Sequence, residues 1–302
     1  MARLDRMSSN NEVAQLSATL GREFDYDLLA AVAPVDEETL RAELAKLVSA
    51  GILLIKGQPP SCVYMFRHAL LEEALLGAMS EANCQRFHRQ VAEAIEARFP
   101  HLVETQPERL AQHFSEAGII EKAVGYCLKA GLRSRDRFAH VETISHLKKG
   151  LELLERLEPS AERDARELEL LGPLGTAYIA SRGYAAPEVG PVFHRARVLG
   201  ERVAETPQFF AVMWGNFAYR IVCGDFRICT KLADETVAFG RRLNDPGILM
   251  EALFLEGITR VYRGDFVGAR NSFAQAIIEY EDPERTAYWA RIVGQHAGVT
   301  HR

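Results

Sequence analysis

Residues 253–283 constrain the fold of this chain more than any other stretch. Their sequence, LFLEGITRVYRGDFVGARNSFAQAIIEYEDP, predicts one helix, a tight turn at Gly264 and Asp265, and a second helix. Ala269, Phe273 and Ala276 lie on one face of the second helix, so two small side chains let the helices approach while the ring fills the groove between them. A single hairpin cannot bury such a face alone, which predicts further hairpins beside it.

The A-x3-F-x2-A spacing is typical of the second helix of a tetratricopeptide (TPR) repeat. The turn Gly264-Asp265-Phe266 also occurs 40 residues earlier, as Gly224-Asp225-Phe226. Weaker copies of the second-helix spacing are Ala123/Cys127/Ala130, Thr143/Leu147/Gly150, Val189/Phe193/Ala196 and Cys229/Ala233/Thr236. Unrelated amphipathic helices can share this spacing, but several copies in series favour a repeat array.

The N-terminal part has a different organisation. Three predicted helices, Asn11–Leu20, Phe24–Val32 and one that begins after the N-cap Asp36, precede a hairpin with strands at 52–55 and 62–66. This is the element order of a winged-helix domain, and the hairpin is the only β structure that the sequence predicts. We therefore expect a mainly α fold: a winged-helix domain over residues 1–78, a helical linker over 79–106, and a TPR-like α-solenoid over 107–302.

Both ends of the sequence read as parts of longer elements. Met1, Leu4 and Met7 have the spacing of trailing helical turns with no cap before them. The last predicted helix, 284–296, has no partner after it, and no capping element follows. The repeat array is thus expected to be incomplete at its C-terminal end.

Charge argues against nucleic-acid binding. Residues 1–75 contain seven Lys and Arg against eleven Asp and Glu, and the third helix opens with Asp36, Glu37 and Glu38. These carboxylates would face phosphates, whereas binding to phosphates depends on cations. A winged-helix transcription regulator remains the alternative, which a gel-shift experiment at several salt concentrations distinguishes.

Motifs for catalysis and for metal binding are missing from the sequence. It contains neither a G-x4-G-K-[ST] phosphate loop nor an H-E-x-x-H helix, so we expect no catalytic residue, no metal site and no enzyme activity. Its five cysteines show no C-x-x-C spacing, which is typical of a reducing compartment. With no signal peptide and no apolar run of membrane-spanning length, the expected location is the cytoplasm.

Four stretches together resemble a known family: Gly21–Phe24, Phe66–Leu71, Glu104–Gly118 and Gly183–Val189. They are similar to the region after the ATPase module in bacterial predicted ATPases of the "signal transduction ATPases with numerous domains" type, in particular those fused to class III adenylate or guanylate cyclases. The resemblance implies a preceding cyclase and AAA-like domain, then a winged helix and TPR-like repeats. ATP or ADP is implied for the full-length family, whereas this chain, without a phosphate loop, is expected to hold no cofactor.

The resemblance also implies one site. In related ATPases a winged-helix histidine reaches the β-phosphate of ADP, and His68, with Arg67, stands at the matching place, where a helix begins. The alternative is that His68 caps or packs locally.

The expected function is that of a regulatory segment whose partners are the parent protein's ATPase domain and a protein or peptide held by the repeats. Trp214, Phe217 and Tyr219 on a first helix are candidate partner-binding residues, with a core role as the alternative. A free-standing adaptor is a further alternative function.

Overall fold

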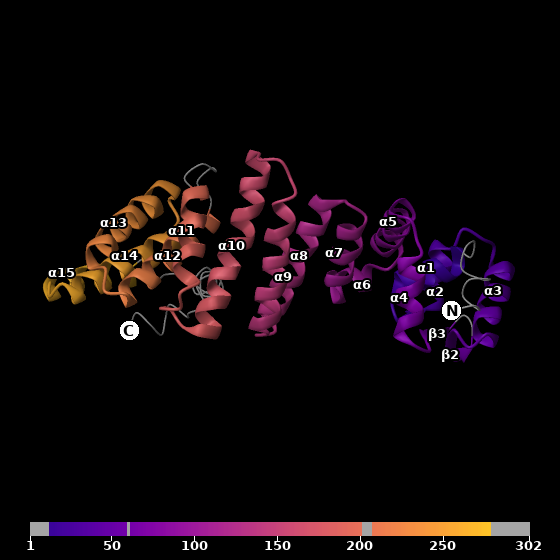
Figure 1. Ribbon diagram of the computed structural model, residues 1–302. Helices are drawn as coiled ribbons and strands as arrows, with labels where there is room; N and C mark the ends of the chain where they lie inside the picture. The colour runs from indigo at the N-terminus through magenta and orange to yellow at the C-terminus, as the bar shows by residue number, and fades with distance from the viewer. Residues whose placement is uncertain (1–11, 59–60, 201–206, 279–302) are drawn as a thin grey trace. The chain divides into compact units, whose positions relative to one another are not determined.

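The computed structural model describes residues 12–58, 61–200 and 207–278, and these residues are mainly helical (Figure 1). The chain divides between Cys127 and Leu128 into two compact units. The helical turns predicted near Met1 and the helix predicted at 284–296 lie outside the described residues. Among the described residues, no helix combines the length and the apolar character needed to cross a membrane.

The first unit contains a small sheet with helices around it. In chain order its elements are α1 (Glu12–Leu20), β1 (Glu23–Asp25), α2 (Tyr26–Val32), α3 (Glu37–Ser49), β2 (Leu53–Gln58), β3 (Ser61–Phe66), α4 (Ala69–Gly77), α5 (Glu81–Arg98), α6 (Pro100–Thr105), α7 (Pro107–Glu116) and the first part of α8 (Ile120–Asp136). The strand order is β1-β3-β2, and both pairs are antiparallel.

Strand β1 corrects the sequence-based prediction. Phe24 was expected to begin the second helix, but it lies in β1 opposite Tyr64 of β3, and the helix begins at Tyr26. Gly21 explains the change of direction, because it ends α1 at φ 104°, a backbone conformation that glycine adopts without strain. The Phe24 ring stacks on Tyr64 with centroids 5.8 Å apart. The short strand β1, which joins the β2–β3 hairpin, thus contributes an aromatic residue to the core.

The predicted N-cap of the third helix is confirmed. Asp36 accepts a hydrogen bond from the Thr39 backbone N–H at 3.0 Å, and this bond holds the pKa of the Asp36 carboxyl below its usual value. The segment predicted as a linker, residues 79–106, consists of α5 and α6, and α5 packs against α1, α2 and α7. The division into three domains at residues 78 and 106 stays a prediction.

A buried histidine pair joins α5 to α7. The Nδ1 atoms of His88 and His113 lie 3.0 Å apart, and the two residues are only 6% and 5% exposed. At this distance one ring donates its Nδ1–H and the other accepts, so the two rings cannot both be protonated at Nδ1. Burial lowers the pKa of both side chains, that of His113 to about 3. The nearby Glu116 carboxylate acts in the opposite direction on the pKa of His88, whereas His88 and Arg109 lower the pKa of His113 further.

The second unit is a series of helices that pack in chain order. After the last part of α8 come α9 (His140–Leu154), α10 (Ala161–Arg182), α11 (Val189–Gly200), α12 (Pro207–Val222), α13 (Phe226–Leu243), α14 (Pro246–Tyr262) and α15 (Phe266–Ile278). From α9 onward each helix packs against the next, and α10 also contacts α12, as α12 contacts α14 (Figure 1). This is the contact pattern of stacked helical hairpins.

The positions predicted to lie between helices are buried. Ala269 and Ala276 are 2% and 0% exposed, and Phe273 is half-buried against Phe254, with ring centroids 5.8 Å apart. The corresponding residues of the other four copies are buried as well: Ala123, Cys127, Ala130, Thr143, Leu147, Gly150, Val189, Phe193, Ala196, Cys229, Ala233 and Thr236. The prediction of hairpins that bury these faces against neighbouring helices is therefore confirmed.

The 40-residue repeat is also visible in the backbone. Gly224 and Gly264 have φ of 78° and 79°, and the residue after each donates to the carbonyl five residues back, Asp225 to Arg220 at 3.1 Å and Asp265 to Arg260 at 3.0 Å. Each aspartate then lies at the start of the following helix and accepts from a backbone N–H three residues on. The same five-residue turn thus connects α12 to α13 and α14 to α15.

Glycines make room for large side chains of a neighbouring helix. The tip of the Phe193 ring in α11 lies between Gly175 of α10 and Gly215 of α12: a Cβ placed at either glycine would meet the ring at 2.4 or 2.1 Å. Gly257 of α14 receives Phe273 in the same way, at 2.3 Å. These contacts are closer than any side chain with a Cβ permits.

The α12–α13 and α14–α15 hairpins place the large and the small residue of this contact on opposite helices. Forty residues before Gly257 stands Phe217, and forty before Phe273 stands Ala233. Both belong to one buried cluster of α12 and α13. The large residue is therefore on the second helix of the α14–α15 hairpin and on the first helix of the α12–α13 hairpin. The summed volume of the large and the small side chain is roughly the same in both hairpins.

Candidate functional site

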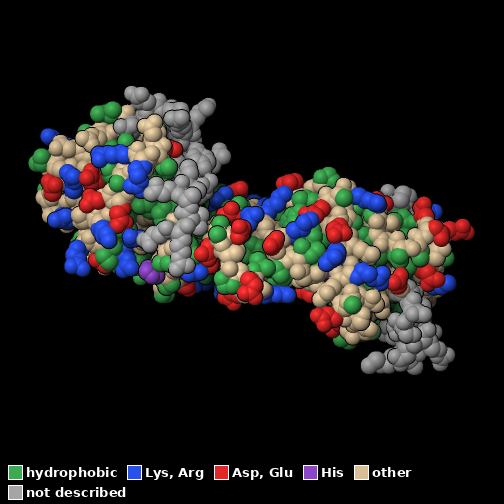
Figure 2. All heavy atoms as spheres, turned by 90° about the horizontal axis from the view of Figure 1, so that it is seen from above, with side chains coloured by type: hydrophobic (Ala, Val, Ile, Leu, Met, Phe, Trp, Pro, Cys, Tyr) green, Lys and Arg blue, Asp and Glu red, His purple; other side chains and the backbone are tan. Residues whose placement is uncertain are grey.

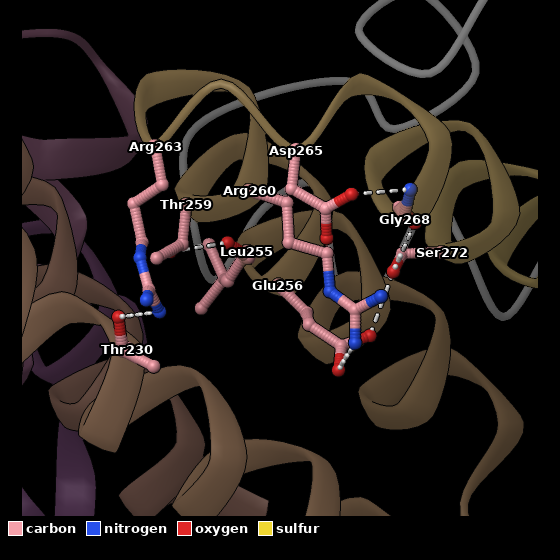
Figure 3. Close-up of polar contacts among 9 residues, drawn as sticks. All are labelled: Thr230, Leu255, Glu256, Thr259, Arg260, Arg263, Asp265, Gly268 and Ser272. Carbon is pink, nitrogen blue, oxygen red and sulfur yellow. Dashed lines mark hydrogen bonds and ion pairs between the residues drawn. The ribbon is translucent and has the colours of Figure 1, made fainter.

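A polar pocket lies between α13, α14 and the turn before α15 (Figure 3). Its volume is about 320 Å³, and it is lined by Thr230, Ala233, Asp234, Glu256, Thr259, Arg260, Arg263 and Asp265. The first three residues come from α13 of one hairpin and the others from α14 and the turn of the next. The pocket thus exists because two successive hairpins pack side by side.

One wall of the pocket is a fixed ion pair. Arg260 donates from Nη2 to Oε1 of Glu256 at 2.8 Å, and the other oxygen of Glu256 accepts from the Ser272 hydroxyl of α15, also at 2.8 Å (Figure 3). The spacing of four residues places Glu256 and Arg260 on the same helical face. Because Glu256 has two partners, this carboxylate is held in one orientation.

The end of the pocket beside Thr230 carries an exposed guanidinium. Arg263, at the end of α14, donates from Nη1 to the Thr230 hydroxyl of α13 at 3.3 Å (Figure 3). A single long hydrogen bond to a neutral group uses one of five N–H donors. Arg263 therefore offers donors to a bound molecule, whereas Asp234 across the pocket offers an acceptor.

The chemistry of these residues is that of binding. Two guanidinium groups and three carboxylates can hold the charged ends and the backbone groups of a peptide. Within the described ranges, no group of three or more His, Cys, Asp and Glu side chains is placed to hold a metal ion.

The predicted partner-binding aromatics lie outside this pocket. Trp214 and Phe217 are 5% and 2% exposed and belong to the core cluster of α12 and α13, so the structure places them in the core role left open by the sequence. Tyr219 is half-buried, with its ring against Gly190 of α11. Near Trp214, burial raises the pKa of Glu251 to about 7, an effect that the indole partly offsets.

His68 and Arg67 are both exposed, at the end of β3 and the start of α4. His68 is the N-cap residue of α4, but its side chain makes no capping hydrogen bond. The local capping role is therefore not seen, and the role in nucleotide sensing stays a prediction.

Sequence reasoning did not find the pocket. Its charged residues have the helical spacing of an ordinary solvated face, and Thr230 and Arg263 are 33 residues apart. One feature of the sequence pointed to this region. Arg220 and Arg260 are 40 residues apart, so an arginine precedes each of the two matching Gly-Asp turns.

Comparisons with known proteins give distant likenesses. No protein-family model matches the chain. An uncharacterized protein of Rhizobium meliloti (strain 1021) is 27% identical over 253 residues, which are 83% of this chain and 24% of that protein. The chain thus spans about a quarter of the length of this curated relative.

Two solved structures also align with the chain. YrrB, described as a TPR protein with an unusual peptide-binding site, is 16% identical with a TM-score of 0.43, over 68% of this chain and 91% of YrrB. A signal transduction ATPase with numerous domains (STAND) protein with a TPR sensor, from Pyrococcus horikoshii, is 13% identical with a TM-score of 0.37, over 99% of this chain and 47% of that protein.

Proposed function

We propose that this chain is a non-catalytic regulatory segment of a cytoplasmic ATPase-coupled signalling protein, of the kind linked to adenylate or guanylate cyclases. In this proposal a winged-helix unit is followed by TPR-like repeats that dock a protein or peptide. The observation that carries it is the pocket between α13 and α14, because both hairpins contribute charged side chains to it. ATP or ADP would be bound by the ATPase module of the longer protein.

The topology of the first unit supports the winged-helix assignment. The order helix, strand, helix, helix and hairpin, with β1 pairing to β3, is that of a winged helix. Its third helix is poorly suited to DNA, because both of its cations are tied to glutamates of the same helix: Arg41 to Glu37 at 2.5 Å and Lys46 to Glu43 at 2.7 Å. On the visible face of the molecule, cationic and anionic side chains are interspersed (Figure 2). We therefore favour protein contacts over the alternative of a DNA-binding regulator.

The docking role is tested by reversing one charge in the pocket. Peptides selected on the chain from a random twelve-residue display library are expected to bind Arg263→Glu at least about tenfold more weakly, since a lost charge-assisted contact is worth about 1.5 kcal/mol or more. Fluorescence anisotropy of labelled selected peptides measures the change in Kd. Thermal unfolding should be unchanged, because Arg263 is exposed.

Arg227→Glu is the matched control. Arg227 is also exposed and follows the equivalent turn by two residues, but it does not line the pocket. The proposal fails if the library yields no binder, or if the two variants weaken the selected peptides equally.

The sensor role of His68 is tested in a longer protein that carries both this segment and an ATPase module. His68→Ala is expected to speed ADP release several-fold, since a contact to the β-phosphate is lost. The exposed His101 supplies the control variant, His101→Ala. Equal ADP retention by the wild type and both variants would exclude the sensor role, while leaving peptide docking in the pocket untouched.

A further inference from the structure

Phe138 occupies a backbone position that is unfavourable for a bulky residue. It lies between α8 and α9 with φ of 58°, in the left-handed region. Its N–H donates to the carbonyl of Arg135, and the next N–H, of Ala139, donates to the carbonyl of Ser134, both at 2.9 Å. These two bonds form a Schellman motif, whose left-handed residue is usually glycine or asparagine.

The same motif recurs in this chain with the usual residues. Helices α3, α7, α12, α13 and α14 end with the same pair of hydrogen bonds, and their left-handed residues are Gly51, Gly118, Gly224, Asn244 and Gly264. Among the described residues, Phe138 and Asn244 are the non-glycine residues with positive φ. Phe138 therefore departs from a rule that the rest of the described chain follows.

Packing of the Phe138 side chain does not offset this backbone strain. Phe138 is 81% exposed, and Val141, the second residue of α9, is 76% exposed. Between them, Nδ1 of His140 is buried without a hydrogen-bond partner in the described part of the chain. The corner formed by residues 137–141 thus combines two features that oppose folding with two exposed apolar side chains, and strained positions in native proteins are typical of functional sites.

The charge around this corner indicates its partner. Residues 129–152 contain six Lys and Arg (Lys129, Arg133, Arg135, Arg137, Lys148, Lys149) and three Asp and Glu (Asp136, Glu142, Glu152), a net charge of +3 within a chain of net charge −5. Glu152 pairs with Lys149 at 4.0 Å. Asp136 is paired with Arg135 at 2.9 Å. An aromatic anchor beside arginines is the usual composition of an interface hot spot.

We propose that the corner around Phe138 and Val141 is a second docking surface, separate from the pocket at Arg263, and that it binds an acidic protein segment with apolar side chains. Phe138 and Val141 lose exposed apolar area to the partner, while Arg137 and its neighbours attract the partner's carboxylates. The left-handed backbone at Phe138 directs the ring away from the core of the hairpin. This inference does not depend on the pocket or on the nucleotide.

The test uses three labelled twelve-residue peptides that differ in one property at a time. The first contains Asp and Glu with Leu and Phe, the second has Lys and Arg in place of the acids, and the third has Ser in place of the apolar residues. By fluorescence anisotropy, only the first is expected to bind, with an affinity that falls as NaCl rises from about 50 to about 200 mM. Phe138→Gly and Arg137→Glu should each weaken it at least about tenfold.

Stability separates docking from a structural role. Phe138→Gly is expected to raise the Tm by about 2 to 4 °C, since it removes the left-handed strain, even though it weakens binding. A lower Tm would show that the ring stabilises the fold, and would overturn the proposal. Equal binding of the first peptide by wild type and Phe138→Gly, equal binding of the second peptide, or no binding at all would also overturn it. Arg263→Glu should leave this binding unchanged, so the two docking surfaces can fail independently.

Discussion

Lowering the pH from 8 to 5 is expected to reduce the free energy of unfolding of the first unit by about 2 kcal/mol through His113 alone. The folded state holds the pKa of this residue at about 3, below the ordinary histidine value of 6.5. Because the pKa of His113 is depressed in the folded state, His113 contributes stability at pH values above its pKa in the unfolded state. This contribution is lost as the pH falls. The loss begins near pH 6.5 and reaches about 4 to 5 kcal/mol near pH 3. His88, whose pKa is also lowered, adds to it.

Two variants isolate the histidine pair. In His88→Leu/His113→Leu the pH dependence between 8 and 5 should largely disappear, with little change at pH 8, because both polar partners are replaced together. His113→Leu alone should cost about 1 to 3 kcal/mol at pH 8, since His88 Nδ1 is then buried without a partner. Urea denaturation followed by pulsed hydrogen exchange and mass spectrometry of α5 and α7 measures these changes. An unchanged pH dependence in the double variant would contradict the assignment, and His101→Leu, at an exposed site, serves as control.

Substitution of Gly175 by alanine is expected to destabilise the second unit by about 1 to 3 kcal/mol, although alanine is the better helix former. The added methyl group would lie 2.4 Å from the Phe193 ring. That ring is fully buried, and Gly215 blocks it on the other side, so it cannot move away. The close approach of three helices therefore outweighs the gain in helix propensity.

Gly125 provides the contrasting substitution. It lies inside α8, is exposed, and has no atom within 4 Å of the position of a new Cβ. Gly125→Ala should therefore stabilise the chain by about 0.5 to 1 kcal/mol. Adding Phe193→Leu to Gly175→Ala should recover part of the loss. The interpretation is wrong if Gly175→Ala and Gly125→Ala change the urea midpoint in the same direction.

Much of the fold could be predicted from local sequence. Helix positions follow from apolar spacing and from caps such as Asp36 and Gly264, and the small-large-small spacing around Phe273 predicted which faces pack. Strand β1 was missed because three residues cannot show an alternating pattern, and its existence depends on pairing with β3, 40 residues away.

The candidate sites depend on contacts between distant residues. Thr230 meets Arg263 and His88 meets His113 only because whole helices pack, and sequence spacing does not encode such pairs. Trp214 shows a second limit of sequence-based prediction. An aromatic residue on a first helix can face a partner or a neighbouring helix, and the elements that pack on it determine which. The sequence shows that residue 138 is Phe, but the importance of Phe138 depends on its positive φ angle, which the sequence does not reveal.

The reversed sizes of the residue pairs Gly257 with Phe273 and Phe217 with Ala233 have a consequence for how such a chain can change length. Because the turns match, removing residues 225–264 would join Gly224 to Asp265 with the backbone in register, yet Phe217 would then oppose Phe273, ring against ring. Duplicating the same segment would bring Ala233 opposite Gly257 and leave a void. The helices are therefore alike in backbone but not exchangeable between hairpins, and each first helix specifies the second helix that packs on it.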